Sequence, residues 1–272
     1  MPQFVSAYRN YIKNTRHCDN YFGFDIRKLA AVEPFLQFLY KDWWRVQFTG
    51  LDLLPKEGPA LIVGNSNGLI PWPAFMLMYA LMSKDSPRRL TIVADMDWIE
   101  DERVHSCLVQ LGFVPWSSTN LKYLFSKGEL VAVFPEGLSA TGKPFSERYR
   151  VREFDWTRLL PAIEAGVPIY PMATIGCDEA SPTLLNVENL SKLLSLPSFP
   201  VTPFFPWFPF PANLGSLPVK WKMSVIKPTS WNESHKDRDA LENTAKQHSR
   251  YVEGQIQAEL NRILRTRIKT FI

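Results

Sequence analysis

The sequence predicts an α/β fold with a largely parallel central sheet flanked by helices, with an N-terminal helix and a long C-terminal helix. Two observations lead to this fold class. Short continuous apolar runs alternate along the chain with segments of helical periodicity, as in buried parallel strands that are joined by helices. The 272 residues are 46% hydrophobic and 21% charged, which is near the globular average and sufficient for a sizeable core.

The predicted elements follow one another in a regular order. A helix is expected over residues 26–44, with Pro34 as a possible kink inside it. Short apolar runs predict buried strands at 60–64, 90–94, 130–134 and 167–173, and alternation predicts another at 220–226. Helical spacing predicts helices at 73–82, 104–111, 121–126, 156–165 and 237–268. Because no Gly/Ser linker divides the chain, we expect an N-terminal helical extension over 1–44 and one α/β domain over 45–272.

Composition indicates a surface that meets something apolar and anionic. The chain has 22 Pro, 9 Trp and a net charge of +4, while the modest charge and the lack of a binding motif argue against nucleic acid as a partner. The three cysteines are far apart, which predicts free thiols in a reducing compartment and no metal site. We expect no signal peptide and no membrane-spanning helix, so the expected location is cytoplasmic and peripheral on a membrane.

Two segments are candidates for that membrane contact. Residues 197–218 contain seven prolines, which excludes a helix and predicts an extended loop, and the Phe and Trp side chains of 199–210 either meet lipid or pack on the sheet. The C-terminal turn carries Arg265, Arg267 and Lys269 among apolar residues. Its charges either bind anionic lipid or belong to a solvated helix end that the helix dipole favours.

The segment 133–143 follows the third predicted strand directly and carries polar residues. Glu136 would lie at the carboxyl end of a parallel strand, where α/β folds bind ligands. Gly137 allows a backbone to approach a substrate closely. Lys143 and Arg148 supply cations for an anionic group of a ligand. The same residues are also compatible with a solvated acidic turn that precedes ordinary surface charge.

Phe134-Pro135-Glu136-Gly137 resembles the Phe-Pro-Glu-Gly motif of the glycerolipid (lysophospholipid) acyltransferase superfamily, whose members acylate lysophosphatidic acid and related acceptors. Further blocks at 61–75, 142–149, 167–172, 200–207 and 217–221 are similar to the family, the last two to a bacterial branch near the diacylglycerol-type enzymes. The resemblance implies acyl-CoA or acyl carrier protein as acyl donor and no other cofactor or metal. It also implies substrate-binding roles for Asn65, Phe134, Pro135, Glu136, Gly137, Lys143 and Arg148.

The two catalytic positions of the family are replaced in this chain. In the family a His takes the proton from the acceptor hydroxyl and an Asp orients that His; here these positions read Ser66 and Pro73. Serine has no basic site near neutral pH, and proline has no side-chain acceptor. Losing a positioned general base costs about 10²–10⁴-fold in rate. Asn65, Gly68 and Pro71 keep the surrounding pattern.

Other residues were weighed as replacements. His105, Asp95 and Asp97 are candidate bases, although each also fits a surface, capping or loop role, and Ser66 as a nucleophile would need a nearby base. The arginine that often recognises phosphate two residues after Phe-Pro-Glu-Gly is Ser139 here. Recognition of a phosphate by that family position is therefore not expected.

The sequence leaves three hypotheses. The first is an acyltransferase-family protein whose standard His/Asp catalysis is lost or impaired, and the second is a non-catalytic lipid- or acyl-CoA-binding partner of an active enzyme. The third is a purely structural interaction protein. In the first two, the expected partners are a lipid or acyl donor and a membrane surface. We expect Ser66, Pro73 and Glu136 to surround one cleft, because each follows a predicted strand of one parallel sheet.

Overall fold

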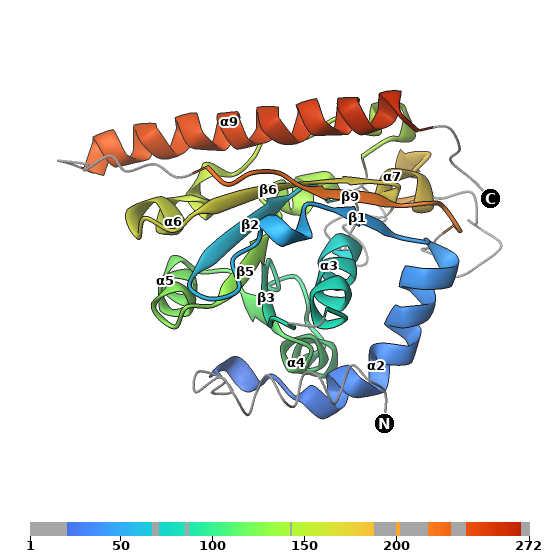
Figure 1. Ribbon diagram of the computed structural model, residues 1–272, viewed down its shortest axis with the longest axis horizontal. Coiled ribbons are helices and arrows are strands. Elements are labelled where there is room, and N and C mark those ends of the chain that lie inside the picture. Colours follow the sequence, from blue (N-terminus) through green and yellow to red (C-terminus); the bar gives the residue numbers. More distant parts are fainter. Residues whose placement is uncertain are drawn as a thin grey trace.

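A computed structural model describes residues 21–66, 71–84, 87–141, 143–187, 200–201, 217–229 and 238–267. Its main sheet has seven strands in the order β1-β9-β6-β2-β5-β3-β4 (Figure 1). All neighbouring pairs are parallel except β6 and β9, which are antiparallel. The predicted α/β fold with a largely parallel sheet is confirmed.

The strands of the main sheet are β1 (Gln47–Thr49), β2 (Ala60–Gly64), β3 (Leu90–Ala94), β4 (Phe113–Pro115), β5 (Leu130–Val133), β6 (Ile169–Ile175) and β9 (Lys222–Val225). A second sheet pairs β7 (Leu185–Asn186) with β8 (Pro200–Val201). The α-helices are α2 (Ile26–Phe38), α3 (Trp72–Met82), α4 (Glu102–Gln110), α5 (Ser118–Ser126), α6 (Leu160–Glu164), α7 (Cys177–Ala180) and α9 (Arg238–Arg265). A π-helical turn, Leu39–Trp43, continues α2.

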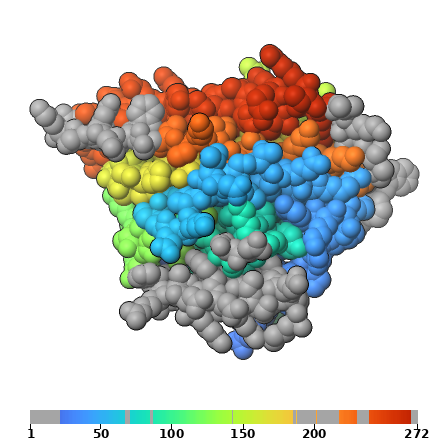
Figure 2. All heavy atoms as spheres, in the orientation of Figure 1, coloured from blue at the N-terminus to red at the C-terminus, as the bar shows by residue number. Residues whose placement is uncertain are grey.

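Two helical layers cover the sheet. On one face α2, α3 and α4 contribute to a core cluster that includes the stacked rings of Trp44 and Trp221, 4.4 Å apart between centroids. On the other face α5, α6 and α9 form the second cluster. The helix α9 runs along one side of the molecule, and α2 forms part of the surface away from it (Figure 2). Because Leu29 and Leu36 of α2 are buried in the first cluster, this helix packs on the same core as α3.

The structure corrects some sequence predictions. The single helix expected over 156–165 is instead a 3₁₀ turn, Trp156–Arg158, followed by the short α6. Pro161 lies in the first turn of α6, where its missing N–H breaks no helical hydrogen bond. Of the predicted loop 197–218, Pro200 and Val201 form β8, residues 217–218 are irregular, and the rest lies outside the described residues.

Among the helices of the described ranges, none is both long enough and apolar enough to cross a bilayer. The long helix α9 is polar on its outer face, and its apolar stripe (Ala245, Val252, Ile256, Leu260 and Ile263) packs on the sheet. The apolar helix α3 has 11 residues, which is well below the roughly 20 that a bilayer requires.

Candidate functional site

The candidate site lies where β2, β5 and β3 end. These strands are parallel neighbours, so the segments that follow them meet at one edge of the sheet. Ser66 and Glu136 lie together: the backbone N–H of Ser66, after β2, donates to Glu136 Oε1, after β5, at 3.1 Å. Of the three residues expected to surround one cleft, however, only Ser66 lines the pocket. Pro73 is buried in the first turn of α3, and Pro71 rather than Pro73 lines the pocket beside Ser66.

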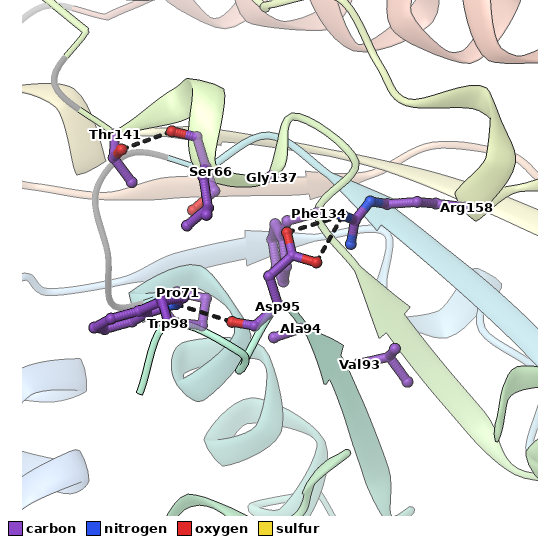
Figure 3. Close-up of a pocket in the computed structure, with 11 residues that line it drawn as sticks. Ser66, Pro71, Val93, Ala94, Asp95, Trp98, Phe134, Gly137, Thr141 and Arg158 are labelled. Atoms are coloured by element: carbon purple, nitrogen blue, oxygen red, sulfur yellow. Dashed lines mark hydrogen bonds and ion pairs between the residues drawn. The ribbon is translucent and has the colours of Figure 1, made fainter. Parts of the chain in front are cut away.

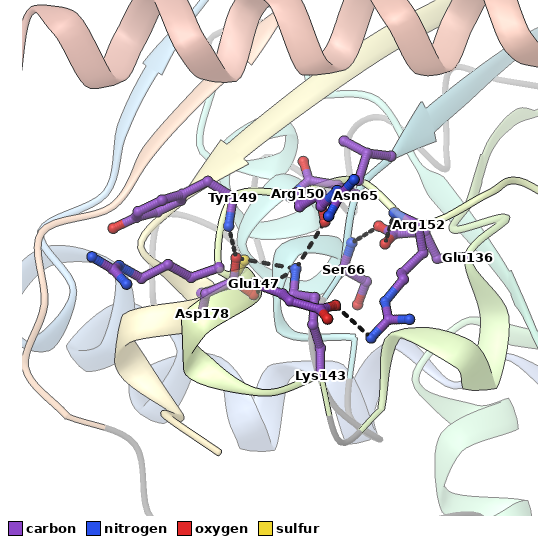
Figure 4. Close-up of polar contacts among 12 residues, drawn as sticks. Asn65, Ser66, Glu136, Lys143, Glu147, Tyr149, Arg150, Arg152 and Asp178 are labelled. Atoms are coloured by element: carbon purple, nitrogen blue, oxygen red, sulfur yellow. Dashed lines mark hydrogen bonds and ion pairs between the residues drawn. The ribbon is translucent and has the colours of Figure 1, made fainter. Parts of the chain in front are cut away.

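Glu136 joins three segments of the chain. Its side chain is buried, and its second oxygen, Oε2, accepts a hydrogen bond from the backbone N–H of Arg152 at 2.9 Å (Figure 4). Burial raises the pKa of Glu136 to about 7, while the two backbone hydrogen bonds and the charge of Lys143 act in the opposite direction. Since both carboxyl oxygens accept backbone hydrogen bonds, Glu136 positions the loops of the site.

Asn65 fixes the end of β2. Its side-chain Nδ2 donates to the carbonyl oxygen of Thr174 at 3.0 Å, and the backbone N–H of Thr174 donates to Asn65 Oδ1 at 2.7 Å. Asn65 is buried, and this pair of hydrogen bonds holds β2 to β6 where Ser66 begins. The amide group that the sequence marked as substrate-binding is therefore used inside the fold.

The two cations predicted after the Glu136 loop have different environments. Lys143 is buried, lies 3.0 Å from Asp178 Oδ1, and donates to the carbonyl oxygen of Arg150 at 3.3 Å (Figure 4). Burial lowers the pKa of Lys143, but the charge and hydrogen bond of Asp178 together with the nearby Cys177 and Glu136 act in the opposite direction, and the pKa of Lys143 is raised overall. Arg148 is exposed, with its guanidinium 4.5 Å above the Phe145 ring. Lys143 therefore serves an internal ion pair, whereas Arg148 faces solvent.

A small pocket opens beside Ser66 (Figure 3). It is lined by Ser66, Pro71, Val93, Ala94, Asp95, Trp98, Phe134, Gly137, Leu138, Thr141 and Arg158. Of the motif residues, Phe134 and Gly137 thus reach the pocket. Pro135 is buried, and its carbonyl oxygen accepts a hydrogen bond from the N–H of Asp155 at 3.0 Å.

Asp95 and Arg158 form the charged part of the pocket. Arg158 Nη2 lies 2.7 and 2.8 Å from the two oxygens of Asp95, and Arg158 Nε lies 3.3 Å from Asp155 Oδ2. Gly137 lies next to the Asp95–Arg158 ion pair and has a φ of +53°. A Cβ atom at this position would lie 3.2 Å from Asp95 Oδ2. Glycine at this motif position therefore provides both the left-handed conformation and the space that the pair needs.

The other candidate bases do not join the pocket lining. Asp97 is exposed, and His105 lies on α4, while Asp95 is the candidate that lines the pocket. Sequence reasoning missed Arg158 and Trp98, because neither belongs to a motif and their approach to Ser66 depends on the fold. Within the described ranges, no three His, Cys, Asp or Glu side chains are grouped as a metal ion requires.

Comparisons with known proteins agree with this architecture. A family model described as "Acyltransferase" matches residues 45–175. The crystal structure of the 1-acyl-sn-glycerophosphate (LPA) acyltransferase PlsC from Thermotoga maritima superposes with a TM-score of 0.55 and 17% identity, covering 89% of this chain and 81% of that chain. At this identity the match shows a shared fold.

Curated relatives come from mycobacteria. Uncharacterized proteins of Mycobacterium tuberculosis and Mycobacterium bovis are each 34% identical to this chain over 234 residues, covering 84% of this chain. An uncharacterized protein of Mycobacterium leprae is 34% identical over 235 residues, again covering 84%. The chain spans 65% of the length of the first two relatives and 64% of the third.

Proposed function

We propose that the chain is a member of the glycerolipid acyltransferase superfamily that binds an acyl donor or a lipid in the Ser66 pocket without performing the standard His/Asp acyl transfer; the acyltransferase model that matches residues 45–175 supports the family. The observation that carries this proposal is Ser66 itself. It occupies the position of the family's general base, borders the pocket, and has its backbone held by Glu136. The acyl donor in this proposal is acyl-CoA or acyl carrier protein.

The surroundings of Ser66 support the loss of standard chemistry. A serine nucleophile needs a base within hydrogen-bond reach. The sequence between residues 18 and 234 contains one histidine, His105, which lies on α4 and is not a pocket-lining residue. The carboxylate that does border the pocket, Asp95, is held by Arg158 on both oxygens. Among the described residues that line the pocket there is no histidine, and the one carboxylate is already in an ion pair, so no free base faces the acceptor hydroxyl.

A second candidate function is acyl transfer with Asp95 as the base. One observation favours it: Asp95 and Ser66 line the same pocket. For this function Asp95 would have to leave at least part of its ion pair with Arg158 before accepting a proton from the acceptor. Non-catalytic binding needs no such rearrangement, so it is the function that the geometry supports best.

The proposal includes contact with a membrane surface. Of the predicted C-terminal charges Arg265 is exposed, but Arg267 is not available for this contact. Arg267 is buried, with Nη1 2.6 and 2.7 Å from the Glu179 carboxylate oxygens, and is therefore not free to meet lipid. Ile263 is likewise buried, and Leu264 packs against the same core cluster. Lys269 and residues 202–210 lie outside the described part of the chain.

A more suitable surface, which we call the aromatic patch, is formed by Phe35 and Phe38 of α2, Trp43 of the π-helical turn and Trp72 of α3. Phe35 and Phe38 are 53% and 44% exposed, and their rings contact Trp72 and Trp43, respectively. The exposed residues Arg27, Lys28 and Lys41 lie on the same helical segment. Aromatic side chains beside basic ones suit the surface of an anionic membrane. Trp72 follows the pocket-lining Pro71, so the patch continues to the site.

Binding and turnover of oleoyl-CoA test the proposal together. The purified chain is titrated with oleoyl-CoA, and CoA release is followed in the presence of lysophosphatidic acid. We expect saturable binding without CoA release above the protein-free rate. Turnover at about 1 s⁻¹ or faster, within the range of ordinary enzymes, would overturn the loss of catalysis. Absence of binding to oleoyl-CoA, oleoyl-acyl carrier protein and lipid would overturn the binding function.

A further inference from the structure

We infer that the head group accepted by the Ser66 pocket is an uncharged polyhydroxyl group, such as the glycerol of a monoacylglycerol or a sugar, rather than a phosphate or an amine. This inference rests on the proposed function, because it names the class of lipid that the same pocket takes. It comes from the Asp95–Arg158 pair, from the hydroxyl groups beside it and from the ring of Trp98.

The charges of the pocket disfavour a phosphate. Arg158 is the one cation among the eleven pocket-lining residues, all of which are described, and two of its three guanidinium nitrogens are already bound to carboxylates. Nη2 binds Asp95, Nε binds Asp155, and the guanidinium lies 4.9 Å from the centre of the Trp116 ring. A phosphate would have to displace Asp95 or approach its negative charge, and like-charge contacts in a pocket are strongly unfavourable.

The described residues that flank the pocket lining in sequence add no unpaired cation. Ser139 takes the place of the arginine that the family resemblance associates with phosphate, and its hydroxyl donates to the carbonyl oxygen of Glu136 at 2.5 Å. Lys143, the nearby buried lysine, is paired with Asp178. Residues 67–70, between Ser66 and Pro71, are Asn, Gly, Leu and Ile and carry no charge.

An amine is disfavoured by the other half of the same pair. A protonated amine that approached the Asp95 carboxylate would also approach the guanidinium of Arg158, which lies 2.7 Å from that carboxylate and has a side chain only 10% exposed. The fixed positive charge of Arg158 cannot be removed by deprotonation at physiological pH. The ion pair therefore excludes full charges of either sign.

Hydroxyl groups match what remains. Each oxygen of Asp95 has further lone pairs that can accept from a hydroxyl. Thr141 donates its own hydroxyl to the carbonyl oxygen of Leu138 at 2.6 Å, which leaves its oxygen as an acceptor, and Ser66 adds another hydroxyl. Trp98, held by a 3.0 Å hydrogen bond from Nε1 to the carbonyl oxygen of Asp95, adds an aromatic surface for C–H groups (Figure 3).

Matched lipids separate the three head groups. The chain is titrated with 1-oleoylglycerol, 1-oleoyl-lysophosphatidic acid and oleylamine in micelles of one uncharged detergent. We expect 1-oleoylglycerol to bind at least about tenfold more tightly than either charged lipid, because a like-charge contact costs more than the 1.4 kcal/mol that a factor of ten represents. Tighter binding of lysophosphatidic acid or of oleylamine, or equal binding of all three, would overturn the inference.

Variants test whether the ion pair causes the preference. Asp95→Asn removes the carboxylate that holds Arg158 in the pocket and leaves Asp155 as its remaining ion-pair partner, so we expect the preference for 1-oleoylglycerol over lysophosphatidic acid to fall about tenfold or to reverse. Asp97→Asn, on the same loop but exposed, is the matched control and should keep the preference. An unchanged preference in folded Asp95→Asn would overturn the role of the pair.

If Asp95→Asn does not fold, Trp98→Ala gives an independent test. We expect it to weaken 1-oleoylglycerol binding about tenfold through the lost stacking surface, while weak lysophosphatidic acid binding stays the same. Equal loss for both lipids would contradict the inference. Oleoyl-CoA binding, measured on the same protein, separates the two proposals. If oleoyl-CoA does not bind while the preference for 1-oleoylglycerol is retained, acyl-donor binding is refuted and the head-group inference is not.

Discussion

The loops that follow β5 and β2 meet at one edge of the sheet but preserve different things. The loop after β5 keeps the full Phe134–Gly137 motif, and Glu136 and Gly137 have visible structural reasons to be there: two backbone hydrogen bonds and a close passage over Asp95. The loop after β2 has Asn65 and the Ser66 backbone contact, and in our proposal it lacks the side chains for proton transfer. The proposal therefore separates the framework of an active site from its chemistry within one pocket.

Restoring the missing side chains should produce the largest effect. We expect the double change Ser66→His with Pro73→Asp to raise CoA release from oleoyl-CoA about 10²-fold or more, the contribution typical of a positioned base. Ser66→His alone should do little, because an unoriented imidazole samples unproductive rotamers and tautomers. Asp is compatible with the first turn of α3, where the helix dipole favours a negative charge.

The control for this restoration is Ser139→His with Pro73→Asp, which places the imidazole after Glu136 instead of after Asn65. It should remain inactive. Equal activity of the control and the Ser66 double variant would show that position 66 is not the position of the missing general base.

Lys143 and Arg148 allow a second comparison, because the sequence predicted a substrate-binding cation at both positions. Replacing Lys143 by Met leaves Asp178 buried without its partner, so we expect a loss of about 3–5 kcal/mol in the free energy of unfolding. The exposed Arg148→Met should cost less than about 0.5 kcal/mol. Urea unfolding measures both. A loss from Arg148→Met equal to that from Lys143→Met would contradict the assignment of Lys143 to the interior.

The pH dependence of stability tests the burial of Glu136. Its pKa is about 7 in the fold and near 4.5 when unfolded, so between these values the folded state binds the extra proton. The free energy of unfolding must then fall as the pH rises through this window, by roughly 2–3 kcal/mol relative to Glu136→Gln, which does not titrate. Urea midpoints at pH 4.5 and pH 8 measure the difference. A constant difference between the two proteins would mean that Glu136 titrates normally.

The aromatic patch should give the smallest effect. We expect Phe35→Ala with Phe38→Ala to weaken binding to anionic vesicles about tenfold, since each exposed ring can bury only part of its surface in the interface. Tyr251→Ala, 45% exposed on α9, is the matched control and should bind as the unmodified chain does. Equal sedimentation of all three proteins with vesicles would exclude α2 as the contact.

The sequence predicted what local pattern encodes. The strands at 60–64 and 90–94 have the expected bounds, because a run of apolar residues is recognisable without its neighbours. Strands β1 and β4 were missed, since three residues are too few to show a period. Pairings of distant residues were also invisible: Arg267 lies 88 residues from Glu179 in the chain, so its charge was taken as free.

The same limit applied to the site. The motif led to Glu136, Gly137 and the missing base at Ser66, since these are fixed by position in the chain. Arg158 reaches Asp95 across 63 residues, and no local pattern announces that contact. The sequence therefore pointed to residues at the pocket but not to its paired charges. We expected Lys143 to present its charge to substrate, because the sequence does not reveal that Asp178, 35 residues away in the chain, pairs with it.

The central claim is that the pocket does not catalyse acyl transfer, because Ser66 occupies the position of the general base. CoA release from oleoyl-CoA, measured side by side for the unmodified chain and Ser66→Ala with 1-oleoylglycerol or lysophosphatidic acid as acceptor, tests it most directly. We expect both proteins to release CoA at the protein-free rate while still binding lipid. Release by the unmodified chain at about 1 s⁻¹ or faster, abolished in Ser66→Ala, would contradict the claim and identify Ser66 as a working catalytic residue.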